Sequence, residues 1–136
     1  VDSIFGTFSW PNGEYICYLS IFDSNPRFLE NKTFQLFYRY PQWGNHIIAH
    51  EMLHFIFFSY LDTKEAKFKN RLDEGVTWLL SEFFNDIILE LPQFNKFGSN
   101  DGGAYPEVRE FAKSFKGKFK GKIDAANFFQ AAKTIL

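Results

Sequence analysis

The chain of 136 residues contains one cysteine, three histidines and almost no excess of either charge. Because Cys17 is alone, an internal disulfide is excluded and the redox compartment stays open. A formal net charge of −1 gives no electrostatic basis for a nucleic-acid or anionic-membrane partner. Long apolar runs are also absent, since the segment 47–61 is too short to span a bilayer and contains ionisable residues. We therefore expect a soluble protein, with no visible signal peptide or membrane span.

Aromatic residues are abundant, with 19 phenylalanines and 21% of the chain aromatic. A short chain so rich in phenylalanine can bury a large apolar area per residue, and some rings can remain as apolar subsites at the surface. The length predicts one domain, 1–136.

Local patterns predict strands first and helices afterwards. Aromatic and β-branched segments at 4–8, 14–22 and 33–40, separated by turn signals, indicate a small and mostly antiparallel sheet of three strands. Apolar residues at helical spacing then predict a helix over 47–61 and a second over 72–90. Two further helices are expected over 105–115 and 125–136, the last capped by Asp124. The expected fold class is α+β, with a small three-stranded N-terminal sheet packed on these four helices.

The most informative stretch is His50-Glu51-Met52-Leu53-His54. On a helix, residues four apart lie on nearly the same face, so two imidazoles can converge on one metal ion while Glu51 remains free to handle a proton. This is the H-E-x-x-H arrangement of zinc-dependent hydrolases. The alternative is a buried helix that carries polar residues by coincidence, and it would have to satisfy all three side chains by other means.

A catalytic zinc site typically has three protein ligands, so a third ligand is needed downstream. Glu74, at the start of the second long helix, is our expected ligand, and Gly75 beside it leaves space for close helix packing. Its other interpretation is an acidic residue that complements the helix dipole. The adjacent Asp73 is an alternative ligand.

The motif His50-Glu51-Met52-Leu53-His54, followed about twenty residues later by Leu72-Asp73-Glu74-Gly75, resembles the gluzincin zinc metallopeptidases. The similarity covers roughly residues 33–115 and is closest to the aminopeptidase N-like branch and the short minigluzincins. The resemblance implies a minimal zincin-like domain in which His50, His54 and Glu74 bind Zn²⁺ and Glu51 is the general base.

The resemblance also implies supporting residues. Thr77 matches a small polar residue that would support a ligand from the second shell, as would Asp73. Tyr105 matches a tyrosine that stabilises the tetrahedral intermediate, and a purely structural tyrosine fits its position equally well. Relatives in the aminopeptidase branch carry a glutamate where this chain has Ser81, one residue before Glu82, and their Gly-Ala-Met-Glu-Asn segment is missing here. These departures favour an endopeptidase over an aminopeptidase.

The sequence therefore predicts a zinc peptidase with a peptide or protein substrate, which could pair with an edge strand from 14–22 or 33–40. A second hypothesis is a zinc-binding interaction module of the same fold that is non-catalytic or self-inhibited. Inhibition would come from its own or a neighbouring C-terminal segment after Lys122. A third is a structural domain without metal. The basic segment 116–122 is interpreted as a solvated loop.

Overall fold

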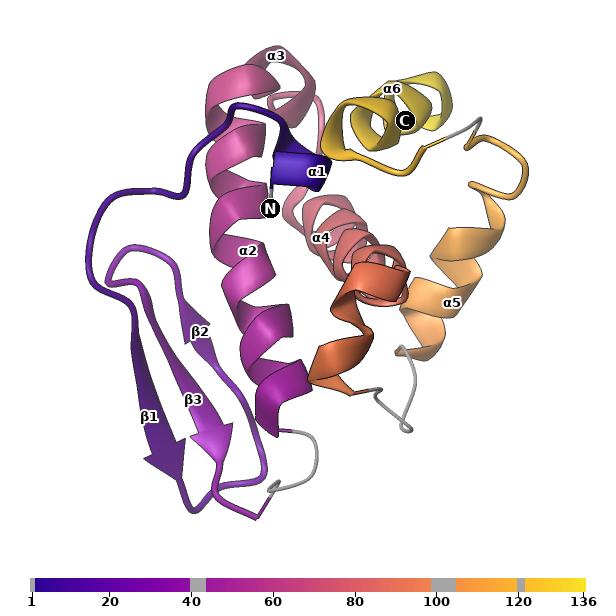
Figure 1. The fold of residues 1–136 in the computed structure, drawn as a ribbon. Coiled ribbons are helices and arrows are strands. Elements are labelled where there is room, and N and C mark those ends of the chain that lie inside the picture. The colour runs from indigo at the N-terminus through magenta and orange to yellow at the C-terminus, as the bar shows by residue number, and fades with distance from the viewer. Residues whose placement is uncertain (1, 40–43, 99–104, 120–121) are drawn as a thin grey trace.

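The computed structural model describes residues 2–39, 44–98, 105–119 and 122–136, and it has an α+β architecture (Figure 1). Its elements, in chain order, are α1 (Asp2–Phe5), β1 (Ile16–Ser20), β2 (Arg27–Phe28), β3 (Thr33–Phe37), α2 (Gly44–Lys64), α3 (Ala66–Lys69), α4 (Glu74–Leu89), the 3₁₀ helix η1 (Pro92–Phe97), α5 (Pro106–Lys113) and α6 (Ala125–Ile135). The sheet lies beside the N-terminal half of α2, and the remaining helices lie on the other side of α2 (Figure 1).

The sheet contains three strands in the order β1-β3-β2. The expected number of strands is confirmed, but the mostly antiparallel arrangement is wrong. The longest pairing, β1 with β3, is parallel and runs from Ile16 opposite Thr33 to Ser20 opposite Phe37, whereas only the short β2 is antiparallel to β3. Parallel strands need a crossover of about a dozen residues. Residues 21–32 supply that crossover and form β2 on the way.

The first expected strand, 4–8, is also wrong, because residues 2–5 form the short helix α1. Ile4 and Phe5 are both buried in the helical core. A run of five residues is too short for its pattern to separate strand from helix, so tertiary packing decides.

Helices α2 and α4 form the centre of the molecule. α2 continues past the expected end at Leu61 to Lys64 and is followed by α3, so much of the expected connector is helical. α4 begins at a capping residue, Asp73, whose side chain accepts a hydrogen bond from the Val76 N–H. Among the described residues, no helix is both long and apolar enough to cross a membrane.

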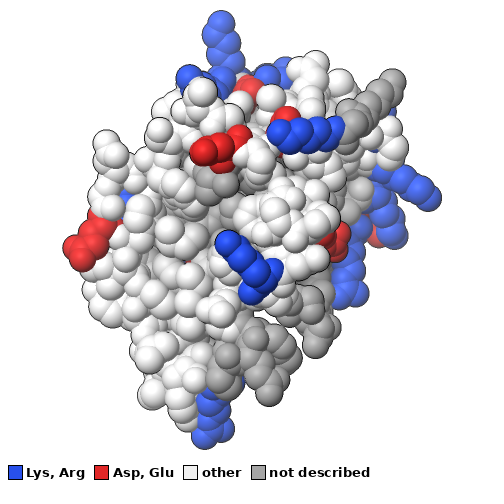
Figure 2. Space-filling model, viewed as in Figure 1, with Lys and Arg blue, Asp and Glu red and all other residues white. Residues whose placement is uncertain are grey.

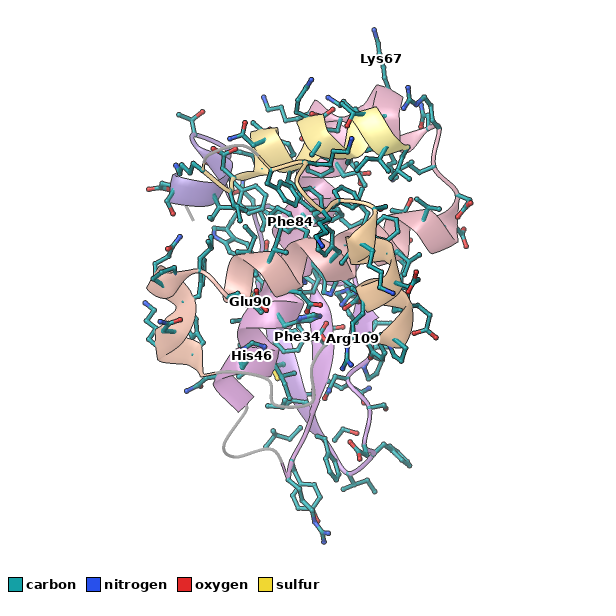
Figure 3. All side chains as sticks on the ribbon, turned by 90° about the vertical axis from the view of Figure 1, so that its right-hand side faces the viewer. Phe34, His46, Lys67, Phe84, Glu90 and Arg109 are labelled. Atoms are coloured by element: carbon teal, nitrogen blue, oxygen red, sulfur yellow. The ribbon has the colours of Figure 1, made fainter. Side chains whose placement is uncertain are left out.

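The core is built largely from phenylalanine rings. Phe84 of α4 lies at the centre of the helices (Figure 3), and its ring contacts Phe57 of α2 and Phe128 of α6 at centroid distances of 5.2 and 4.9 Å. α6 begins as expected, with Asp124 accepting a hydrogen bond from the Asn127 N–H. The last helix therefore closes the core by packing against both central helices.

Candidate metal centre

Two histidine side chains of α2 converge at the centre of the candidate site. His50 and His54 are one turn apart, and their Nε2 atoms lie 3.0 Å from each other. His54 is completely buried and His50 is partly exposed. The expected pairing of these two imidazoles on one helix face is present.

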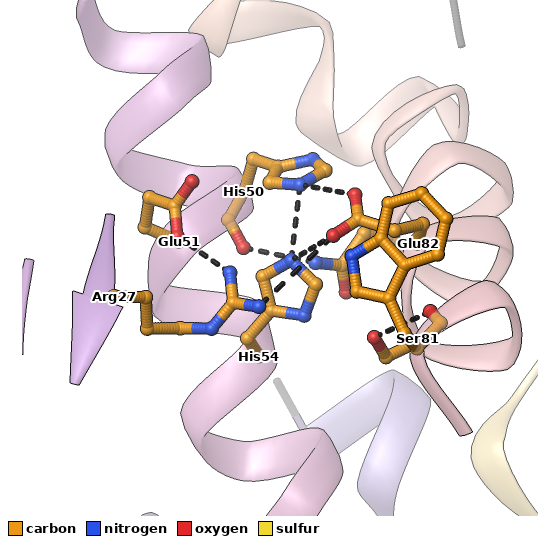
Figure 4. A network of polar contacts seen from close by, with 8 residues as sticks. Arg27, His50, Glu51, His54, Ser81 and Glu82 are labelled. Atoms are coloured by element: carbon orange, nitrogen blue, oxygen red, sulfur yellow. Dashed lines mark hydrogen bonds and ion pairs between the residues drawn. The ribbon is translucent and has the colours of Figure 1, made fainter. Parts of the chain in front are cut away.

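Glu82, from the middle of α4, completes the group. Its Oε2 lies 3.0 Å from His50 Nε2, and its Oε1 lies 3.3 Å from His54 Nε2 (Figure 4). Ligands at about 2.0–2.1 Å from a tetrahedral zinc ion would be roughly 3.4 Å from one another. The group of His50, His54 and Glu82 is thus compact enough to hold a metal ion.

The hydrogen-bonding capacity of the three groups favours a shared cation. A neutral imidazole Nε2 either donates or accepts a hydrogen bond, and an ionised carboxylate only accepts. If both Nε2–H groups donate to Glu82, the 3.0 Å contact between the imidazoles joins two donors. If His54 donates to His50, then His50 Nε2 and Glu82 face each other as two acceptors. Protons can therefore satisfy two of the three contacts, whereas one cation satisfies all three.

Glu74, the third ligand expected from the sequence, lies outside this group. It is exposed at the first position of α4 and lines a separate cavity with Leu72 and Thr77. Glu74 precedes Glu82 by eight residues, which corresponds to about 12 Å along a helix. The carboxylate that the structure brings to the two histidines is that of Glu82 instead of Glu74, because the middle of α4 lies against this part of α2.

Burial controls the charges of the group. It lowers the pKa of His54 to about 3, so this imidazole is neutral at physiological pH, as a metal ligand must be. Burial alone would raise the pKa of Glu82, but hydrogen bonds from both histidines outweigh it and hold that pKa well below its usual range. The resting site consequently combines a carboxylate with at least one neutral imidazole.

Glu51 lies beside the metal group and has a partner of its own. Arg27 of β2 contacts the Glu51 carboxylate, with Nη1 at 2.7 Å from Oε2, and its Nη2 lies 4.0 Å from Oε1 of Glu82. Figure 4 shows the guanidinium between these two carboxylates. Glu51 is only 6% exposed, and burial raises its pKa although Arg27 and His50 oppose the shift.

A hydrogen bond from α4 to the backbone of α2 links the two central helices at the site. The Asn85 side-chain amide donates to the backbone carbonyl of His50 at 3.0 Å, which ties the two ligand-bearing helices together. Ser81 donates to the Trp78 carbonyl within α4 and is buried. His54 Nδ1 is buried without a hydrogen-bond partner among the described residues.

The group opens onto a cavity of about 470 Å³, a size typical of small-ligand sites. The cavity is lined by the segment 23–27, by His50, Glu51 and Glu82, and by the aromatic pair Trp78 and Tyr105. The Trp78 and Tyr105 ring centroids are 5.5 Å apart, and Tyr105 is 59% exposed. Tyr105 therefore lines the same cavity as the metal group, and Gly102 and Gly103 before it lie outside the described residues.

The other expected residues do not reach the metal group. Asp73 caps α4, and the Thr77 hydroxyl donates to the Asp73 carbonyl. The third histidine of the chain, His46, which the motif does not include, contacts the Gly98 carbonyl through Nδ1 at 3.1 Å. Of the described residues that follow Lys122, none lines the cavity, because α6 packs in the core.

Arg27 and Glu82 are the site residues that motif reasoning missed. The position of Glu82 did carry a signal, since it lies between Leu80 and the pair Phe83-Phe84 on α4, and a glutamate buried there needs partners. Arg27 carries no comparable signal, because it arrives from a two-residue strand whose position depends on the sheet topology.

Comparisons of this chain with protein-family models, curated proteins and solved structures find no match.

Proposed function

We propose that this protein is a zinc-dependent peptidase, and that it acts as an endopeptidase. The proposal rests on one observation: the residues that can bind a metal ion and the residue that can accept a proton are different residues beside one cavity. His50, His54 and Glu82 form a group that can hold a metal ion, whereas Glu51 lies next to them with a different partner. A structural metal site would need no second carboxylate on the cavity side, but hydrolysis needs one to accept the proton of the attacking water.

Zinc suits this donor set better than magnesium or calcium. Two imidazole nitrogens and one carboxylate are typical of catalytic zinc sites that leave a position for water, whereas magnesium and calcium prefer oxygen ligands. When bound, zinc would polarise the scissile carbonyl and lower the pKa of its water toward neutrality. His50 and His54 would bind through Nε2, and Glu82 through a carboxylate oxygen.

Glu51 is the proposed general base. Arg27 contacts Oε2, so Oε1 is the oxygen that can accept a proton from water and deliver it to the leaving amine. Burial raises the pKa of Glu51, which makes its carboxylate a better proton acceptor. Arg27 holds the carboxylate in a fixed orientation, and it partly offsets that gain in basicity.

The proposed substrate is an extended peptide lying along the segment 23–27. β3 is the central strand and pairs on both sides, so the expected pairing of substrate with 33–40 is blocked where β1 and β2 contact it. The segment 23–27 lines the cavity opposite Trp78 and Tyr105, which would hold apolar side chains of the peptide. The Tyr105 hydroxyl remains the proposed donor to the developing oxyanion. An α+β fold with a sheet beside the H-E-x-x-H helix is compatible with a minimal zincin-like domain.

The decisive experiment uses Glu51→Gln. The zinc-loaded wild type is incubated with a peptide library, and cleavage is followed by mass spectrometry. Glu51→Gln should retain zinc and fold while hydrolysis falls by about two to four orders of magnitude, because a positioned proton-transfer group contributes that much. Glu30→Gln, at an exposed turn residue, is the matched control and should cleave normally. Equal cleavage by the Glu51 variant would remove it from the mechanism.

A second candidate is a metal-binding interaction module without turnover. The 2.7 Å ion pair between Arg27 and Glu51 favours it, since a carboxylate held by a cation is a weaker base. In the same experiment, this function predicts a wild type that binds zinc stoichiometrically and cleaves no peptide.

A further inference from the structure

The outer strand β1 has one unpaired edge. Among the residues that the structure describes, the strand order is β1-β3-β2, and β1 pairs only with β3. Four large side chains of β1 and of the two residues after it are unusually exposed, with exposed fractions of 54% for Tyr18, 75% for Leu19, 77% for Ile21 and 69% for Phe22. The cavity of the metal group takes no lining residue from β1.

The strand also lacks the usual protection of a sheet edge. Monomeric proteins place lysine, proline or other charges on such strands to prevent pairing with another chain. Here residues 15–22 contain neither proline nor any charged side chain. In the space-filling view, the surface over the sheet is largely without acidic or basic groups (Figure 2).

The backbone of β1 determines which groups are available. The Ile16 N–H donates to the Lys32 carbonyl, and the Ser20 carbonyl accepts from the Tyr38 N–H. Because successive residues of a strand direct these groups to opposite sides, Ile16, Tyr18 and Ser20 face β3. Cys17 and Leu19 therefore direct their N–H and C=O groups toward the open edge.

We propose that β1 is a dimerisation strand that pairs antiparallel with β1 of a second copy of this chain. With the two-fold axis at Tyr18, Cys17 of each copy lies opposite Leu19 of the other, and these are the residues with free backbone groups. The match is self-complementary, as a two-fold interface requires. The strand that pairs with this edge must be uncharged and apolar, because a charged strand would lose its solvation and find no opposite charge on β1. The β1 strand of a second copy meets this requirement.

The exposed area indicates a weak dimer. Large side chains each offer on the order of 150 Å², so the four exposed residues would bury roughly 800 Å² over both copies. Strand backbone and neighbouring side chains add to this, which brings the interface near the lower limit of about 1,200 Å² for specific complexes. We therefore expect a weak dimer that dissociates on dilution.

Sedimentation velocity of the full chain from about 1 to 200 μM tests the proposal. The wild type should shift from monomer to dimer, and Leu19→Lys should remain monomeric with an unchanged circular dichroism spectrum. Phe28→Lys, which adds the same charge at an exposed position of β2, is the control and should still dimerise. Amide exchange at Leu19 should slow with wild-type concentration, because its N–H becomes paired.

Three outcomes would overturn the proposal. The first is a wild type that stays monomeric over the whole range, which would mean that β1 meets another partner or none. The second is growth beyond the dimer into open assemblies, because two-fold pairing closes after two copies. The third is a dimer that survives Leu19→Lys. None of these results depends on zinc binding or on peptide cleavage.

Discussion

Replacing a carboxylate of α4 by an amide tests whether Glu82 or Glu74 is the third metal ligand. Glu82→Gln keeps the size of the side chain and removes the negative charge between the two imidazoles, whose Nε2 atoms lie 3.0 and 3.3 Å from its oxygens. Glu74→Gln makes the same chemical change on the same helix, at an exposed position. The two variants therefore carry the same chemical change on the same helix and differ in burial and in distance from His50 and His54.

The expected size of the effect follows from the number of ligands. Structural zinc sites with four protein ligands bind with about 10–16 kcal/mol, or roughly 3 kcal/mol per ligand. Loss of one ligand should thus raise the dissociation constant by about a hundredfold or more, at 1.4 kcal/mol for each factor of ten. Glu74→Gln should stay within about twofold of the wild type, because a side chain about 12 Å away along the helix cannot coordinate the same ion.

Competition with a chromophoric chelator measures both dissociation constants, and circular dichroism confirms that each variant is folded. Cobalt substitution provides a second reading, because its visible absorption reports tetrahedral coordination and should weaken only in Glu82→Gln. A large loss of affinity in Glu74→Gln, with Glu82→Gln unaffected, would refute the arrangement of α4 against α2. Equal, small effects in both variants would refute a carboxylate ligand on α4 altogether.

Two further predictions concern charges around the site. Arg27→Met should tighten zinc binding about tenfold, because it removes a cation that repels the metal ion. The same variant should lower the melting temperature of the chelator-treated protein, since Glu51 loses its partner. The control variant Arg39→Met, at an exposed residue, should change neither quantity. Burial, assisted by Glu82 and Glu90 and opposed by His50 and Arg109, raises the pKa of the half-buried Asp86 to about 6. The folded state then holds this proton more tightly than the unfolded state, so the stability that the proton provides is full below the unfolded pKa near 3.8 and is lost as the pH rises through 6. In chemical denaturation with chelator, Asp86→Asn should be more stable than the wild type by about 1–2 kcal/mol at pH 8 and nearly equal to it at pH 4, and an equal difference at both pH values would contradict this account.

The parts of the fold that sequence predicted correctly depend on local spacing. The His50–His54 pair, the α2 and α4 helices and the cap at Asp124 all follow from residues within a few positions of one another. The H-E-x-x-H segment needed nothing beyond a helix to align its imidazoles. Such features survive whatever the tertiary arrangement is.

The features that differ from the sequence-based expectations involve residues far apart in the sequence and the direction in which strands pair. The partner of β1 lies beyond a twelve-residue crossover, and the pattern of residues 14–22 is the same whether the pairing is parallel or antiparallel. The third ligand depends on where α4 crosses α2, which no local pattern specifies. The apolar neighbours of Glu82 were the better indicator of the third ligand, because a buried Glu82 requires partners that an exposed Glu74 does not.

The burial of polar groups argues against a purely structural domain. Glu51, His54, Glu82 and Asn85 are each at most 6% exposed, in a chain whose phenylalanines already fill the core. Well-packed apolar residues of similar volume are often as stable as buried ionic groups, or more so. Stability alone therefore gives no reason for two carboxylates, a guanidinium and two imidazoles to converge at one cavity. The proposed site gives four of them a role, since His50, His54 and Glu82 would hold the metal ion and Glu51 would take up the proton.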